Sequence, residues 1–520
     1  MSAPRRVLAA SLALMFVAAG LFASPQSDAA MAEGPVELTM LLHEWPKDPI
    51  KTEWPIWEEI TTRANVVIVP HIVPQSEWQE KVQVLLNSGD IPDLLPTVRA
   101  PDSWRYGQGG VLLNLSDHED KISNFTALVE TFGFGGEVDN VRDVNGDLYG
   151  IPAFSEVAFQ GHAWLVRMDL VEKHGFTWPP ENLDALTDMM TTIQAAEPEL
   201  KFGYSNKLGM GLMLTLWGPL FGVIGNDNDG MIYDWEGDSW YHEPTSDNYR
   251  ALLTHLNSLY EAGLFDPEIP TLEAAQWMEN VANGQYFLAS DWSGNAIRYT
   301  EGGKANYGES FNMIPVLPPT GPAGMVHKAR NRMSDSLMVT PARIADDGKL
   351  DAVLGFMNWI FSEEGITLMT WGTEGYTYET VDGTTRFTEE FLLPNGSVNR
   401  DKFSKDTGYN MIYGLSRFQP ADKLLAWNVG SAGAQKDYYD DLFQLDIVPA
   451  QDPVVKLSAD DTEDANLVVG RLKGYTDEMI SQFIYGRASI ADGWDAYVEE
   501  AKKLGRDELV DLYNAAWQGG

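Results

Sequence analysis

The sequence lacks cysteine and is poor in basic residues. Its 520 residues include 36 Lys and Arg against 76 Asp and Glu, so the formal net charge is −40. Without cysteine the chain has no disulfide, thiolate zinc site, iron–sulfur cluster or cysteine nucleophile. Because an acidic body repels polyphosphates and anionic membrane surfaces at long range, we expect no nucleic-acid partner.

Motifs for cofactors and catalysis are also scarce. The glycines of residues 133–136 and 209–211 have neither the dinucleotide-binding nor the Walker spacing, and no G-x-S-x-G elbow occurs. No two of the eight histidines stand four residues apart, as a helical zinc pair requires. We therefore expect no cofactor and no metal centre. Residues 225–236 match four positions of an EF-hand loop but begin with Gly225, which leaves calcium binding open.

The beginning of the chain is typical of a secretory signal peptide. Arg5 and Arg6 precede an apolar stretch from Val7 to Ala23, and small residues follow. We expect residues 1–30 to be removed on export, with a retained N-terminal anchor as the alternative. Ser24 stands where a lipoprotein would carry its acylated cysteine, so we expect no lipid anchor. The sequence thus predicts a periplasmic or extracellular protein.

The rest of the chain has the composition of a packed globular protein. It is 44% hydrophobic, and its length is too great for one core, which indicates two lobes or more. Expected strands at 36–42 and 65–69 alternate with a helical period at 78–86, a pattern that predicts parallel βαβ units. Ser489 and Asp492 have the spacing of a helix capping box. Because no linker separates the lobes, we expect strands that cross between them.

Aromatic residues are abundant. The chain has 17 Trp, 20 Tyr and 21 Phe, more Trp than a core alone requires. The flat face of an indole stacks on the C–H faces of sugar rings, while carboxylates accept hydrogen bonds from hydroxyls at the rim. The combination of Trp with many carboxylates favours a carbohydrate ligand.

Eight segments, in the same order along the chain, resemble motifs of the extracellular solute-binding proteins of ABC transporters, family 1. They are most similar to its large sugar- and oligosaccharide-binding, lipoprotein-like members. Residues 195–203 depart from that pattern, because they lack the Asp and Asn residues of the calcium loop in the larger alginate-binding relatives. The eight segments are Gly89–Leu94, Asn145–Pro152, Trp164–Asp169, Trp178–Leu183, Asn283–Leu288, Pro315–Pro322, Phe361–Tyr378 and Ser489–Val498.

The resemblance implies an α/β protein with the type II periplasmic-binding-protein fold, in which two hinged lobes surround a ligand cleft. It places residues 31–153 and 313–370 in the N-terminal lobe, and residues 154–312 and 371–520 in the C-terminal lobe. It implies a monomer that captures a sugar or oligosaccharide, delivers it to the membrane permease of an ABC importer, and catalyses no reaction.

Residues that follow strands, or that match the family motifs, are the expected ligand contacts. We expect no catalytic residue and no metal ligand among them. The predicted ligand-binding residues are Glu44, Trp45, Asp93, Glu156, Trp217, Trp292, Trp371, Glu374 and Tyr378.

Three alternatives remain open at this stage. The chain could be a secreted enzyme that cleaves polysaccharides, either a glycoside hydrolase or a lyase, with two carboxylates across the cleft. It could present bound sugar to a membrane receptor instead of a permease. A peptide could also replace the sugar, because extended backbones use the same aromatic and carboxylate groups.

Overall fold

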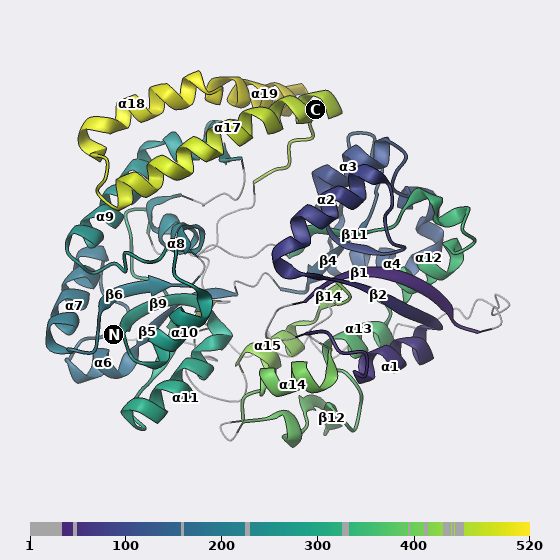
Figure 1. Cartoon of the computed structure of the whole chain (residues 1–520), viewed down its shortest axis with the longest axis horizontal. Coiled ribbons are helices and arrows are strands. Elements are labelled where there is room, and N and C mark those ends of the chain that lie inside the picture. Colours follow the sequence, from purple (N-terminus) through teal and green to yellow (C-terminus); the bar gives the residue numbers. More distant parts are fainter. Residues whose placement is uncertain are drawn as a thin grey trace, which may run out of the picture.

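The computed structural model shows two lobes side by side, with a layer of C-terminal helices that extends from one lobe toward the other (Figure 1). It describes residues 34–44, 49–157, 161–207, 209–223, 229–324, 332–393, 396–409, 414–429, 438, 441–442 and 452–519. The predicted signal peptide, residues 1–30, lies outside the described residues.

The first lobe draws its strands from three parts of the chain. Strands β1 (Val36–Glu44) and β2 (Val66–Pro74) pair in parallel, as the sequence predicts for the strands at 36–42 and 65–69. A four-stranded sheet has the order β14–β4–β11–β3. Its strands are β3 (Leu95–Arg99), β4 (Ile151–Ser155), β11 (Met333–Val339) and β14 (Phe418–Gln419).

Helices and a small hairpin surround these strands and share one apolar core with them. They are α1 (Pro55–Ala64), α2 (Trp78–Ser88), α3 (Ala100–Gln108), α4 (Ser123–Phe132), α5 (Gly135–Asp139), α12 (Leu350–Trp359), α13 (Glu363–Thr370), α14 (Arg400–Thr407), α15 (Ala421–Val429), and the hairpin of β12 (Tyr378–Val381) and β13 (Thr384–Phe387).

The second lobe contains a sheet of order β10–β5–β9–β6 and a separate hairpin, β7–β8. The strands are β5 (His162–Arg167), β6 (Phe202–Asn206), β7 (Met231–Asp234), β8 (Ser239–His242), β9 (Tyr286–Trp292) and β10 (Met313–Val316). The helices are α6 (Met168–Lys173), α7 (Leu183–Ala196), α8 (Gly209–Trp217), α9 (Asp247–Glu261), α10 (Ala274–Ala282) and α11 (Ala296–Tyr307).

The sheet of the second lobe is covered on both faces. Along β5, Ala163 and Leu165 belong to the core shared with α10 and α11, whereas Trp164 and Val166 belong to the core shared with α7, α8 and α9. This alternation follows from the two-residue period of a strand. Because both faces are buried, its strands are apolar almost throughout, and polar side chains concentrate at the strand ends.

Two sequence-based expectations about this architecture are wrong. The sheets are mixed, since β5 runs antiparallel to β9, and β11 runs antiparallel to both β3 and β4. Strand β5 follows β4 after only six residues, yet it belongs to the sheet of the other lobe. The simple parallel βαβ pattern therefore holds only for pairs such as β1 with β2, and β6 with β9.

The expected lobe boundaries at residues 313 and 371 also need correction. Strand β10 pairs with β5, so the chain returns to the first lobe only after Val316. Trp371, Phe403 and Trp427 all lie in the core of the first lobe. The segment from residue 371 to α15 therefore extends the first lobe, because its aromatic side chains complete that core.

The C-terminal helices α17 (Ala459–Ile484), α18 (Ile490–Lys503) and α19 (Arg506–Gly519) pack on the second lobe. The Ser489 hydroxyl accepts a hydrogen bond from the Asp492 amide at 3.2 Å, which confirms the N-cap half of the predicted capping box, and it donates to the Asp492 carboxylate at 2.9 Å. Just before α17, Lys456 Nζ reaches the Asp143 carbonyl of the first lobe at 3.4 Å. Among the described helices, none combines the length and apolarity that a membrane span requires.

Candidate functional site

The strand directions define the edges at which the two lobes face each other. In the second lobe, His162 at the start of β5 pairs with Trp292 at the end of β9. In the first lobe, Met333 at the start of β11 pairs with Phe154 near the end of β4. The chain crosses between the lobes at these edges, from β4 to β5 and from β10 to β11. A ligand cleft is expected there, outside the carboxyl ends of the parallel strands.

Trp292 is the most exposed aromatic residue at the second-lobe edge. It keeps 39% of its surface exposed, and its ring contacts the His162 ring with centroids 4.3 Å apart. A Cβ on Gly161 would approach the indole to 2.0 Å, so this position has room only for glycine while the ring stays in place. The Ser293 amide also donates a hydrogen bond to the Gly161 carbonyl at 2.7 Å. This backbone bond and the His162 ring together hold the indole in place.

Asp291, the residue before Trp292, forms a buried ion pair. The carboxylate of Asp291 is fully buried and lies 2.7 Å from Lys207 Nζ, which follows β6. Asn295 Nδ2 donates to the same carboxylate at 2.7 Å, and the Tyr299 hydroxyl donates to it as well. Burial and this carboxylate raise the pKa of Tyr299, so its hydroxyl remains a donor. The network anchors the end of β9 and the helical turn η6 (Ser293–Asn295) that follows it.

At the first-lobe edge, two predicted carboxylates hold backbone groups. Glu156 follows β4, and its carboxylate accepts a hydrogen bond from the Ala421 amide at 2.7 Å, at the start of α15. The Glu156 amide donates to the Gln419 carbonyl at 3.0 Å. Glu44 ends β1 and accepts from the Ile50 amide at 3.0 Å. Both side chains lie at the expected edge and remain partly exposed.

Helices α14 and α15 belong to the first lobe and contact the second lobe near this edge. A Cβ on Gly294 of η6 would lie 2.5 Å from Arg400 Nη1, so the two lobes are in direct contact here. The Arg400 guanidinium lies 5.1 Å from the Trp427 ring, and Lys423 Nζ lies 4.7 Å from the same ring. Lys423 is 7% exposed. Burial and the charge of Arg400 lower the pKa of Lys423 to about 7.

Three predicted contacts are buried in the cores and do not line the cleft. Asp93 accepts a hydrogen bond from the Thr39 amide and one from Lys349, both at 2.8 Å, which makes it a structural anchor of the first lobe. Trp217 has no exposed surface because it packs among the aromatic residues of the second-lobe core. Trp371 is 5% exposed and packs on Phe387 with centroids 4.9 Å apart. In this conformation these three predictions are wrong.

The remaining predictions have less decisive positions. Glu374 is exposed and pairs through its backbone with Tyr378, whose ring packs toward Trp371 in the first lobe. Their part in ligand binding stays a prediction. Trp45 lies outside the described residues.

The structure adds residues that the sequence analysis missed. His162, Lys207, Arg400, Lys423 and Trp427 lie at or near the facing edges. Lys207 could have been found, because it directly follows a predictable buried strand. The two cations near Trp427 carry no sequence signal, since their position depends on how α14 and α15 pack.

Within the described ranges, no group of three or more His, Asp or Glu side chains is placed to hold a metal ion. Part of the EF-hand-like segment, residues 225–228, lies outside those ranges. Of the part inside, Asp229 accepts hydrogen bonds from the Met231 amide at 3.0 Å and the Tyr513 hydroxyl at 2.7 Å.

Comparison with known proteins agrees with this geometry. The chain is 21% identical to Lipoprotein LipO of Bacillus subtilis over 60% of its length, and spans 61% of that protein. It is 20% identical to the polygalacturonan/rhamnogalacturonan-binding protein YtcQ of Bacillus subtilis, over 98% of this chain and 97% of that protein. Among solved structures, the alginate-binding protein AlgQ2 without calcium ion superposes with a TM-score of 0.75 and 18% identity, covering 94% of this chain and 99% of AlgQ2.

The superposition with AlgQ2 confirms the predicted two-lobe fold. A family model, described as bacterial extracellular solute-binding protein, matches residues 58–377, which is more than half of the chain. The chain therefore belongs to the family of bacterial extracellular solute-binding proteins, whose members are exported.

Proposed function

We propose that the protein captures a sugar or oligosaccharide between its two lobes and delivers it to the membrane permease of an ABC importer. Trp292 is the observation that carries the proposal. It is a fixed, exposed indole at the edge where the lobes face each other. The names of YtcQ and AlgQ2, both polysaccharide-binding proteins, support a carbohydrate ligand.

The chemistry of the edges suits recognition. The indole offers an apolar face to a sugar ring, and Glu44 and Glu156 offer acceptors to hydroxyl groups. The Arg400 guanidinium beside Trp427 provides local positive charge within an acidic protein, which would tolerate an acidic sugar. The sugar would be released from the cleft without chemical change, since recognition of this kind needs no catalytic group.

Lobe closure would couple binding to transport. Helix α15 contacts η6 of the second lobe, and its first amide is held by Glu156 of the β4–β5 crossover. A sugar that contacts both edges stabilises the closed arrangement by its differential affinity for it. The permease would then recognise the surface that closure creates.

Export and assembly complete the proposal. We infer that residues 1–30 are a cleaved signal peptide and that the exported protein is a monomer in the periplasm or outside the cell. Because the sequence has no cysteine, a thioether-linked lipid anchor has no site.

The test is a titration of the exported protein with acidic and neutral oligosaccharides, such as oligogalacturonate and maltotriose, followed by intrinsic Trp fluorescence. We expect saturable binding of at least one sugar, which chromatography then recovers intact. A recovered sugar that has been cut would contradict the proposal and favour a polysaccharide-cleaving enzyme. Failure of every sugar in the panel to bind would contradict the carbohydrate ligand.

A further inference from the structure

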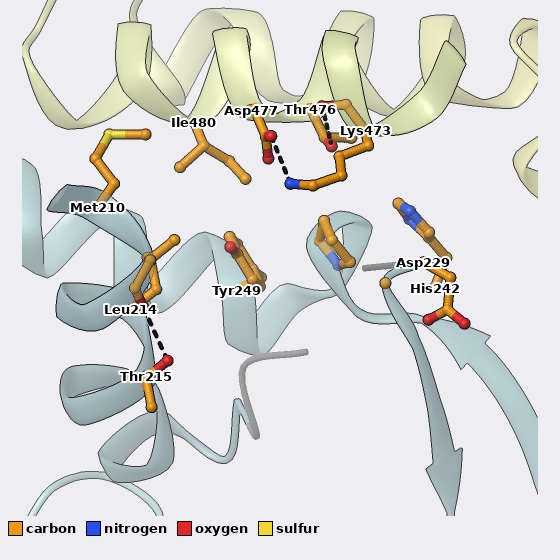
Figure 2. A pocket seen from close by; sticks show the side chains of 13 residues that line it. Met210, Leu214, Thr215, Asp229, His242, Tyr249, Lys473, Thr476, Asp477 and Ile480 are labelled. Carbon is orange, nitrogen blue, oxygen red and sulfur yellow. Dashed lines mark hydrogen bonds and ion pairs between the residues drawn. The ribbon is translucent and has the colours of Figure 1, made fainter. Parts of the chain in front are cut away.

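A cavity of about 380 Å³, partly open to solvent, lies between α17 and the rest of the second lobe (Figure 2). Its walls come from α8, the segment before β7, the end of β8 with the turn η5 (Glu243–Thr245), α9 and α17. All of these elements belong to the second lobe. The shape of the cavity therefore does not depend on closure of the two lobes, and none of its lining residues belongs to the cleft edges described above.

The two ends of the cavity differ in chemistry. Met210 and Leu214 of α8 face Ile480 of α17 at one end, which is apolar (Figure 2). His242 lies at the other end, and the ion pair of Lys473 and Asp477 on α17 lies between His242 and Ile480. A molecule that fits this space needs one apolar edge and one polar edge.

Tyr249 lies between the two ends and turns its hydroxyl toward the cavity (Figure 2). The residue is only 5% exposed, and it lines the cavity. Burial raises the pKa of this phenol, so it stays protonated. The hydroxyl can therefore donate a hydrogen bond to a ligand oxygen in the cavity.

His242 offers a second polar group to the cavity. The Thr245 hydroxyl donates to the His242 carbonyl oxygen at 3.0 Å, and imidazole Nδ1 lies 3.3 Å from the same hydroxyl. Burial and the charge of Arg506 lower the pKa of His242 to about 4, so the ring is neutral at pH 7. In the tautomer that carries its proton on Nδ1, that nitrogen donates to Thr245 and Nε2 is an acceptor. Gly230 leaves room for this nitrogen, since a Cβ there would lie 2.9 Å from Nε2.

The polar end thus favours a neutral ligand that carries hydroxyl groups. Hydroxyls can donate to His242 Nε2 and to Asp477 and can accept from Tyr249. Lys473 is already paired with Asp477, with Nζ and the carboxylate 2.6 Å apart, so an anionic ligand would have to compete with that pair.

We propose that this cavity is a second binding site, for a neutral hydroxylated molecule with one apolar edge, such as a 6-deoxyhexose. The methyl group would contact Met210, Leu214 and Ile480, and the ring hydroxyls would reach Tyr249 and His242. This site goes beyond the proposed function of the cleft, because its occupancy requires neither lobe closure nor Trp292.

Matched sugars test the proposal by titration calorimetry. D-Fucose and D-galactose differ only in the hydroxyl at C6, and the exchange of that hydroxyl for hydrogen suits the apolar end. We expect D-fucose to bind at least about fourfold more tightly, the value of roughly one buried methyl group. The Tyr249→Phe variant removes one hydroxyl from the cavity and should weaken D-fucose binding by about two- to tenfold.

A blocking variant separates this site from the cleft. Gly211 lines the cavity, and a Cβ there would meet no atom within 4 Å, so Gly211→Trp can enter the space without a backbone clash. Gly474→Trp is the matched control, since Gly474 is exposed on α17, has equal room for a Cβ, and does not line the cavity. We expect D-fucose binding to be lost in Gly211→Trp but retained in Gly474→Trp and in Trp292→Ala.

Three results would overturn the second site. They are the absence of D-fucose binding to the unaltered protein, equal affinity for D-fucose and D-galactose, and D-fucose binding that survives Gly211→Trp. D-Fucose binding that is lost in Trp292→Ala would also contradict it, because the sugar would then occupy the cleft. The first three of these results do not bear on whether an oligosaccharide binds between the lobes.

Discussion

Replacement of Trp292 by alanine is the sharpest test of the cleft. Trp292 leaves 39% of its surface exposed, which is about 100 Å² for a Trp side chain of roughly 250 Å². At about 25 cal/mol per Å², a sugar that covers all of this area gains about 2.5 kcal/mol, and one that covers half gains about 1.2 kcal/mol. Trp292→Ala should therefore weaken sugar binding by about 8- to 70-fold.

The assay is titration calorimetry with whichever oligosaccharide binds the unaltered protein. Trp235→Ala is the matched control, because Trp235 is 56% exposed but lies at the tip of the β7–β8 hairpin. We expect it to leave the affinity within twofold. The reasoning is refuted if Trp292→Ala binds as tightly as the unaltered protein, or if both variants lose affinity equally.

Three further predictions follow from the same contacts. Gly161→Ala places a Cβ against the indole of Trp292; calorimetry should show weaker sugar binding, whereas unchanged affinity would mean that the ring is not fixed as described. Lys423 has a folded-state pKa of about 7, below its unfolded value near 10.5, so the unfolded chain binds the extra proton between those values and stability rises with pH there. Denaturant unfolding at pH 7, 8 and 9 should show the unaltered protein gaining roughly 1 kcal/mol per pH unit relative to Lys423→Met; a constant difference would contradict the buried position. Trp217→Ala should cost about 3 to 5 kcal/mol of unfolding free energy as a core truncation, and a fully stable variant would show that this indole is not part of the core.

The sequence was most informative about segments whose role is local. The strands at 36–42 and 65–69 and the helix N-cap at Ser489 follow from hydrophobic alternation and residue spacing, and the structure confirms them. The order of motifs along the chain predicted the family and its fold, because each motif marks one element of a shared architecture.

The sequence was least informative about which side of an element faces the cleft. Trp292 and Trp217 both follow or end regular elements, yet one is exposed at the edge and the other is enclosed by aromatic neighbours. Asp93 belongs to a family motif, but its partners Thr39 and Lys349 are distant in sequence, so its structural role depends on tertiary contacts. The position of Lys423 near Trp427 depends in the same way on the packing of α14 and α15.

Small-angle X-ray scattering with and without a saturating oligosaccharide tests the central claim most directly, namely that a sugar binds between the lobes and closes them. We predict a smaller radius of gyration for the sugar-bound protein. The sugar concentration is chosen to saturate the unaltered protein and to stay below the dissociation constant of Trp292→Ala, and at that concentration we predict no change in the radius of gyration of the variant. An unchanged radius of gyration at full occupancy of the unaltered protein would contradict the account.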